Sequence, residues 1–297
     1  MEKISDKIFG DIAPRNTNKV VFPSIGKCIY CGFSEGRLTD EHIIPFSMGG
    51  IQIMEKASCD SCSEITSKFE LIFSREIFGD FRTKHKLPSR RKKKRPDKKL
   101  VRMVNGDEIE VPFSEFPAPT YMLKCTEAGI LNDISPNADM SFLWQIIMLT
   151  DNKNLDDFTT KYGTEVTYRF RHSPQQFAQT LAKIAHSYVM AYWGKFEFEK
   201  LALDLILGRS NNLSYVVGGS LEISPSIPGA GHLLDISVST DFGMNVLLII
   251  VNIRLFASSD TPNYHVVVGR VRDKNIIQEI IKICKDGGSE LNPILAV

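Results

Sequence analysis

The sequence predicts an α+β protein in which a small, cysteine-bearing N-terminal module is joined by a basic segment to a larger α+β domain. Two C-x-x-C pairs lie close together near the start of the chain, and strand and helix patterns in mixed order follow a strongly basic stretch. With 297 residues, 43% hydrophobic and 24% charged, the chain is long enough for about two folded domains. This composition excludes disorder, collagen and coiled coil as descriptions of the whole chain.

The predicted regions are residues 1–80 for the module with its N-terminal arm, 81–99 for a basic connector and 100–297 for the α+β domain. Within the module, Lys19–Phe22 suits a short strand, and the apolar spacing over Ala57–Phe81 predicts a helix. Prolines and like charges both oppose helix formation, so we expect Leu87–Lys99 to be extended and exposed.

The C-terminal region mixes strand and helix signals. Asn105-Gly106, between two short apolar stretches, is a strong hairpin signal. A capping serine and a first-turn proline at Ser173-Pro174 predict a helix that continues to Trp193. Further strands are expected at Tyr121–Cys125, Glu165–Arg171, Met244–Phe256 and His265–Val271, and a closing helix at Asp273–Lys285.

Two properties of the whole chain bear on its location and partners. The most apolar stretch, Val246–Val251, is far shorter than a membrane span, and no apolar segment follows Met1, so we expect a cytoplasmic protein without a membrane partner. The net charge of +1 conceals eleven basic residues and one aspartate between Arg82 and Lys99. Such a basic element favours a polyanionic partner.

Four of the six cysteines form two C-x-x-C pairs, Cys28 with Cys31 and Cys59 with Cys62. Without a secretory signal, such pairs indicate metal binding or redox chemistry rather than structural disulfides. Four thiolates are the tetrahedral ligand set of a closed structural Zn²⁺ site, which has no open position for water. The expected zinc therefore folds the module and does not catalyse. Cys125 and Cys284 are interpreted as buried small apolar residues.

The segment between the pairs reads Asp40-Glu41-His42-Ile43-Ile44-Pro45 and is followed by Gly49-Gly50. With the motif from Cys28 to Gly32, and with Cys59 to Cys62 opening a helix, it resembles the HNH endonucleases, the zinc-knuckled branch of the ββα-metal nucleases. The resemblance covers about residues 27–75. It implies a ββα-metal module and a metal-dependent endonuclease that hydrolyses DNA phosphodiester bonds, with RNA not excluded. Restriction or anti-phage defence is a setting by analogy alone.

The residues of this motif suit phosphodiester hydrolysis. A neutral imidazole can take the proton of an attacking water near pH 7, and a hard divalent ion such as Mg²⁺ or Mn²⁺ offsets the phosphoryl charge. The family pattern implies His42 as the base and Glu41 as a metal ligand, with Asp40 as the fallback ligand. Neighbouring strand residues point to opposite faces, so Glu41 and His42 can work together only if the strand twists or ends there.

The sequence departs from the family pattern at two positions. Met54 stands where the family has the asparagine that braces the ββ loop, and Ser63 stands where it has a metal-binding His or Asn. Serine is a poor Mg²⁺ ligand, so another helix residue is expected to contribute. Ser63, Ser67 and Glu70 share one helix face, with Glu64 to one side. The candidate ligands of the catalytic ion are therefore Glu41, Asp40, Ser63 and Glu70.

The basic connector is the predicted contact with nucleic acid. Its side chains would neutralise phosphates and give salt-sensitive affinity without a base code, and a solvated linker is the alternative. The predicted contacting residues are Arg90, Arg91, Lys92, Lys93, Lys94, Arg95, Lys98 and Lys99. His172 and His186 are interpreted as structural or surface residues.

Two alternatives to a nuclease stay open. The first is a non-catalytic zinc-finger protein that binds nucleic acid and carries a degenerate HNH site. The second is a function located in the C-terminal domain, as a ligand sensor or an assembly domain. A homo-oligomer is compatible with each of these functions.

Overall fold

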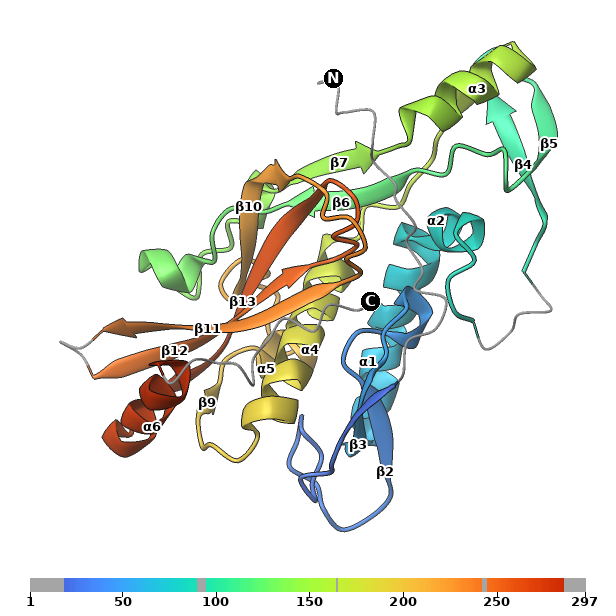
Figure 1. Ribbon diagram of the computed structural model, residues 1–297. Coiled ribbons are helices and arrows are strands. Elements are labelled where there is room, and N and C mark those ends of the chain that lie inside the picture. Colours follow the sequence, from blue (N-terminus) through green and yellow to red (C-terminus); the bar gives the residue numbers. More distant parts are fainter. Residues whose placement is uncertain (1–18, 90–94, 164, 242–244, 286–297) are drawn as a thin grey trace.

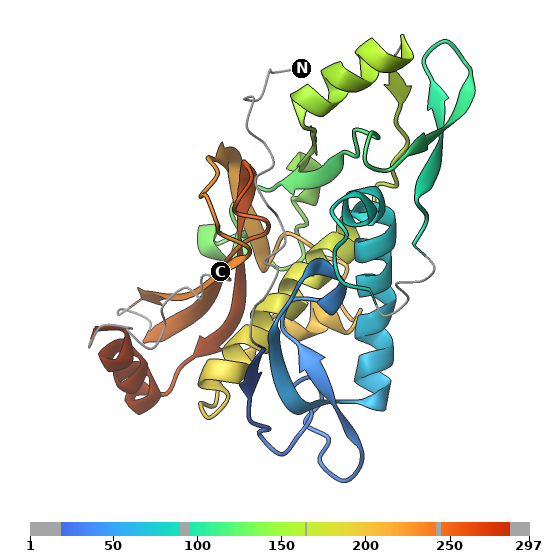
Figure 2. The same ribbon diagram turned by 45° about the vertical axis from the view of Figure 1, so that its right-hand side comes forward.

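The computed structural model describes residues 19–89, 95–163, 165–241 and 245–285. The fold is α+β, as predicted. Its central element is α4 (Pro174–Trp193), a helix that is buried along most of its length. The N-terminal unit packs on one side of α4 and an antiparallel sheet on the other (Figures 1 and 2). This helix therefore connects the motif-bearing part of the chain with the rest.

The N-terminal unit consists of a small sheet followed by helices. Its elements are β1 (Val20–Phe22), β2 (Leu38–His42), β3 (Gln52–Cys59), α1 (Asp60–Ile72), a π-helical turn (Phe73–Ile77) and α2 (Gly79–Lys84). β2 and β3 are antiparallel, and β1 joins β3 in parallel. The prediction of a helix from Ala57 is wrong at its start, because Ser58 and Cys59 pair with Thr39 and Leu38 of β2.

Steric constraints explain why Gly49 and Gly50 lie between β2 and β3. Gly49 ends a 3-10 turn with a φ of 94°, a conformation that favours glycine. A side chain on Gly50 would collide with the backbone carbonyl of Ile44. This close approach turns the chain from β2 into β3 and sets the end of β2 at His42.

The larger sheet covers the other side of α4. Its strands are β9 (Glu199–Lys200), β10 (Val217–Ser224), β11 (Leu233–Asp241), β12 (Val246–Arg254) and β13 (Thr261–Val271). The strand order is β10-β13-β12-β11, all antiparallel, and β9 pairs with β13. The short helix α5 (Leu203–Ile206) and the final helix α6 (Lys274–Lys285) complete this part. The strands and closing helix predicted after residue 244 are confirmed.

A third unit forms a separate, smaller core. Its elements are β4 (Lys98–Met103), β5 (Glu108–Pro112), α3 (Asn152–Tyr162) and β8 (Val166–Thr167). The strands β6 (Thr120–Lys124) and β7 (Gln145–Leu149) pair with each other and contribute Met122, Leu123 and Leu149 to the main core. The β4–β5 hairpin turns at Gly106, whose φ is 96°, as the Asn105-Gly106 signal predicted. The strand expected over Glu165–Arg171 is wrong in length, because only β8 within it pairs, with β4.

The main core joins the N-terminal unit to the C-terminal part. It includes Ile29 and Phe69 of the N-terminal unit, Ile184 of α4 and Val268 of the large sheet. This shared core does not follow the predicted division at 80 and 99, positions that fall within α2 and β4. Among the described helices, none is both long and apolar enough to cross a membrane.

Candidate functional site

The two cysteine pairs meet at the start of α1. Their four sulfur atoms lie within 4.8 Å of one another, and the Sγ atoms of Cys31 and Cys59 are 3.6 Å apart. Tetrahedral zinc with Zn–S bonds of about 2.3 Å requires sulfur separations of about 3.8 Å. The chain brings them together because Cys28 and Cys31 lie on one tight turn, while Cys59 ends β3 and Cys62 begins α1. The donor set and spacing fit zinc.

The electrostatics of Cys28 also suit a metal ligand. Burial by itself raises the pKa of this thiol, but hydrogen bonds from backbone amides outweigh burial, and the net pKa is lowered. The amide donors include those of Cys59 and Cys31. A lowered pKa favours the thiolate, which is the form that binds metal.

Glu41 and His42 lie at the end of β2 and face different surroundings. A register shift between Thr39 and Glu41 distorts the pairing of β2 with β3. The Glu41 side chain points inward and is 9% exposed, whereas His42 is half-buried, with its ring edge-on to Phe46 at 5.6 Å between centroids. As expected for neighbouring residues of a strand, the side chains of Glu41 and His42 do not point to the same place.

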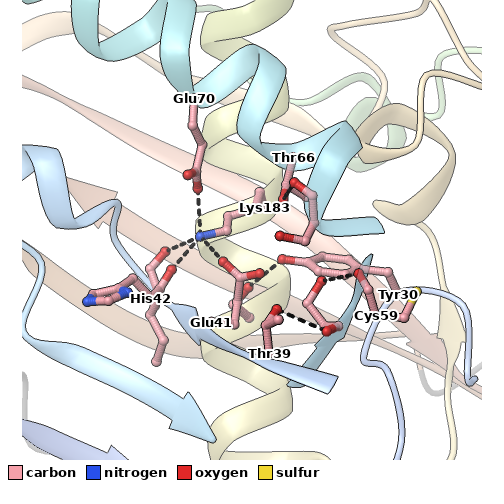
Figure 3. A network of polar contacts seen from close by, with 12 residues as sticks. Tyr30, Thr39, Glu41, His42, Cys59, Thr66, Glu70 and Lys183 are labelled. Atoms are coloured by element: carbon pink, nitrogen blue, oxygen red, sulfur yellow. Dashed lines mark hydrogen bonds and ion pairs between the residues drawn. The ribbon is translucent and has the colours of Figure 1, made fainter. Parts of the chain in front are cut away.

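The carboxylates of Glu41 and Glu70 meet at the ammonium group of Lys183, a residue of α4 (Figure 3). Lys183 Nζ lies 2.6 Å from Glu41 Oε1 and 2.7 Å from Glu70 Oε1. It also donates hydrogen bonds to the backbone oxygens of His42 and of Ile43, the second at 3.4 Å. The contact with Glu70 is an ion pair without hydrogen-bond geometry. Lys183 is fully buried, so this is an internal charged cluster.

The cluster keeps Lys183 charged. Burial alone lowers the pKa of Lys183, but the charges of Glu41 and Glu70 outweigh it, and the pKa is raised. Burial raises the pKa of Glu41, and the charge of Glu70 raises it further, whereas Lys183 and a hydrogen bond from Tyr30 oppose this. The raised pKa of Lys183 keeps its ammonium group protonated, and the raised pKa of Glu41 favours the protonated carboxyl group. A proton on Glu41 brings the net charge of the cluster closer to zero.

The other predicted ligands of the catalytic ion lie outside this cluster. Asp40 is exposed, and its Oδ1 accepts a hydrogen bond of 3.1 Å from the backbone amide of Lys56. Ser63 is half-buried in the first turn of α1, at the other end of the helix from Glu70. Met54, at the position of the family asparagine, is buried and pairs with Glu41 across the β2–β3 ladder.

A divalent ion does not fit between Glu41 and Glu70 as these residues stand. Their oxygen atoms have the chemistry that Mg²⁺ prefers, but a cation of the chain itself already lies between them. Sequence reasoning missed Lys183. The available signal was a lone lysine between Ala182 and Ile184 in an otherwise apolar stretch of helix.

Lys183 belongs to a polar face of α4 that holds the N-terminal unit. One turn further on, His186 Nε2 lies 2.8 Å from the carbonyl oxygen of Ile29, and Ser187 Oγ lies 3.2 Å from the Tyr30 hydroxyl. Residues three and four apart share a helix face, so these contacts form one row. Burial lowers the pKa of His186 to about 4, which keeps this ring neutral. The structural interpretation of His186 is confirmed.

The basic connector is described only in part, since Arg90, Arg91, Lys92, Lys93 and Lys94 lie outside the described residues. Arg95 donates to the carbonyl oxygen of Leu87. Lys98 lies 3.5 Å from Glu110, and Lys99 is paired with Asp80. Both lysines belong to β4, so this end of the segment is extended, as expected, but it is already part of a paired strand.

The cysteine-bearing unit thus has the order strand, strand and helix, with a four-cysteine cluster at the start of the helix. Residues 28–77 match the family model described as HNH endonuclease. No curated protein and no solved structure matches the chain. The match concerns this segment and suggests nuclease activity on nucleic acid.

Proposed function

We propose that the protein is an HNH-type nuclease that hydrolyses phosphodiester bonds of DNA, with His42 as the general base. The observation that supports this best is the family match over residues 28–77, with His42 half-buried at the end of β2. A neutral imidazole there would take the proton of an attacking water near pH 7. RNA is not excluded as a substrate, and a role in restriction or anti-phage defence rests on analogy alone.

In this proposal the zinc and the catalytic divalent ion have separate roles. Zinc on the four cysteines would hold β2, β3 and α1 together, with no position open for substrate. A catalytic Mg²⁺ or Mn²⁺, which the resemblance implies, would need ligands other than the paired carboxylates of Glu41 and Glu70. The basic connector would contact phosphates, and residues 100–297 would choose the target or pair subunits.

A second candidate function is a non-catalytic protein that binds nucleic acid through a degenerate HNH module. The ion pair between Lys183 and Glu41 favours it, because a predicted metal ligand is already neutralised. Ser63, in place of a His or Asn ligand, favours it as well. Nucleic-acid binding without cleavage is the behaviour that separates this candidate from the first.

The test is cleavage of a supercoiled plasmid with Mg²⁺, with Mn²⁺ and with chelator, comparing the wild-type protein with His42→Ala. Loss of a general base typically slows a reaction by about 10²–10⁴-fold, and we expect a loss in this range. The matched control is His172→Ala, which removes an exposed histidine elsewhere and should cleave normally. Binding without cleavage by the wild-type protein would select the second candidate, and undiminished cleavage by His42→Ala would mean that another residue is the base.

A further inference from the structure

The buried surroundings of Lys183 Nζ have the composition of a cation site. The neighbouring atoms are the carboxylate oxygens of Glu41 and Glu70 and the backbone oxygens of His42 and Ile43. Two carboxylates with two carbonyl oxygens form a donor set typical of hard divalent cations. Here the cation within this set is the ammonium group of Lys183.

We propose that Lys183 is the resident cation of this site and takes the place of a divalent ion between β2 and α1. The side chain reaches that place from α4, and Glu41 and Glu70 lie on either side of its ammonium group (Figure 3). It links the two elements on which the family pattern puts metal ligands, since Glu41 lies in β2 and Glu70 in α1. Lys183 is therefore a positioning residue that holds the strand end carrying His42.

The ammonium and a divalent ion exclude each other at this place. Lys183 is fully buried and Glu41 nearly so. In such a region of low dielectric, the positive charges of the ammonium group and of a divalent ion would repel each other strongly. Four oxygens already surround Nζ, and a second cation would need the same carboxylates. The site with Lys183 in place therefore binds no divalent ion through Glu41 and Glu70. This exclusion does not depend on whether the protein is catalytically active.

The test is Mn²⁺ binding to the zinc-loaded full chain, measured by the loss of the free-ion signal in electron paramagnetic resonance. We expect wild-type protein to show no binding that depends on Glu70, so that wild type and Glu70→Gln give the same titration. Lys183→Ala removes the ammonium and leaves space, and we expect it to bind one additional Mn²⁺ per chain. Adding Glu70→Gln to Lys183→Ala should abolish that gain.

Lys183→Met is the matched control, because its neutral side chain is of similar length, fills the space and should bind no additional Mn²⁺. Binding by wild-type protein that Glu70→Gln removes would overturn the proposal. A folded Lys183→Ala protein that gains no Mn²⁺ site would overturn it too. If Lys183→Ala does not fold, the comparison of wild type with Glu70→Gln still decides whether wild-type protein binds the ion through Glu70, which would overturn the proposal.

Discussion

Two clusters of ligand-type side chains lie along α1, and only one of them leaves room for a metal ion. At the start of the helix, four cysteine sulfurs lie within 4.8 Å of one another. Further along, the carboxylates of Glu41 and Glu70 face each other across the ammonium of Lys183. The residues at both places suit cations, but at the second place the protein supplies the cation itself.

The two clusters differ in how far apart in the sequence their residues lie. All four cysteines come from one short segment, so their turns and the β2–β3 ladder bring them together locally. The carboxylate cluster is completed by α4, which follows more than a hundred residues later in the chain. A distant residue can therefore change what the carboxylates of a family motif bind.

The largest expected effect is at the cysteine cluster. Cys59→Ser removes one of four zinc ligands, and zinc binding contributes about 10–16 kcal/mol to the folding of isolated zinc fingers. We expect loss of bound zinc and unfolding of the N-terminal unit, measured by elemental analysis and thermal melting. Cys284→Ser, outside the cluster, should keep one zinc per chain. A Cys59→Ser protein with full zinc content and unchanged melting would contradict the assignment.

The next effect is at the carboxylate cluster. Lys183→Met leaves two buried or half-buried carboxylates without their cation, and breaking a buried pair in this way costs about 3–5 kcal/mol. Urea unfolding should show this loss, and adding Glu41→Gln should recover part of it. Lys68→Met, which breaks an exposed pair on α1, is the control and should change stability little. Additive effects of Lys183→Met and Glu41→Gln would show that the two residues are not coupled.

Acid should destabilise the protein through the buried ring of His232. His232 lies 2.9 Å from the carbonyl oxygen of Met48 and accepts from the amide of Phe256, and burial lowers its pKa from 6.5 to about 4. The unfolded chain therefore binds a proton between pH 6.5 and 4 that the folded chain does not. The contribution of His232 to stability should therefore fall by about 3 kcal/mol as the pH drops through this window.

Urea unfolding at pH 7 and pH 4.5 measures the contribution of His232. In His232→Gln the loss of stability on acidification should be smaller than in the wild-type protein, because the titrating ring is gone. Changing the exposed His172 to glutamine should leave the pH dependence as it is. An equal loss in His232→Gln and wild type would mean that other groups account for the acid sensitivity.

The smallest effect concerns the basic connector. Replacing Arg90–Lys94 by glutamine should flatten the dependence of DNA affinity on salt, by about 0.9 in logarithmic slope for each phosphate that is no longer neutralised. Lys98→Gln with Lys99→Gln is the control, since these lysines already pair with Glu110 and Asp80 and should matter less. Fluorescence anisotropy at several salt concentrations measures both. Equal slopes in all proteins would make the segment a linker.

Much of the N-terminal unit was predictable from local sequence. The cysteine spacing indicated the four-sulfur cluster, and the Asp40–Pro45 motif indicated the HNH resemblance that the family match bears out. The hairpin at Asn105-Gly106 and the helix that starts at Pro174 were also predictable, because turns and first-turn prolines depend on a few adjacent residues. The expected cap is wrong in one respect, because the Ser173 side chain makes no capping hydrogen bond. The limits of the helices were harder to predict from sequence. Pairing with β2, for example, keeps Ser58 and Cys59 extended.

Local chemistry could be derived from the amino-acid sequence: the four cysteines as a metal-binding set, the turn at Asn105-Gly106, and a histidine, His42, that follows a carboxylate. Tertiary structure alone decided that Glu41 faces Lys183 and that one core joins the motif to the large sheet. The physical reason is that a buried charge needs a partner in space, and spacing along the chain does not specify a partner on a distant helix.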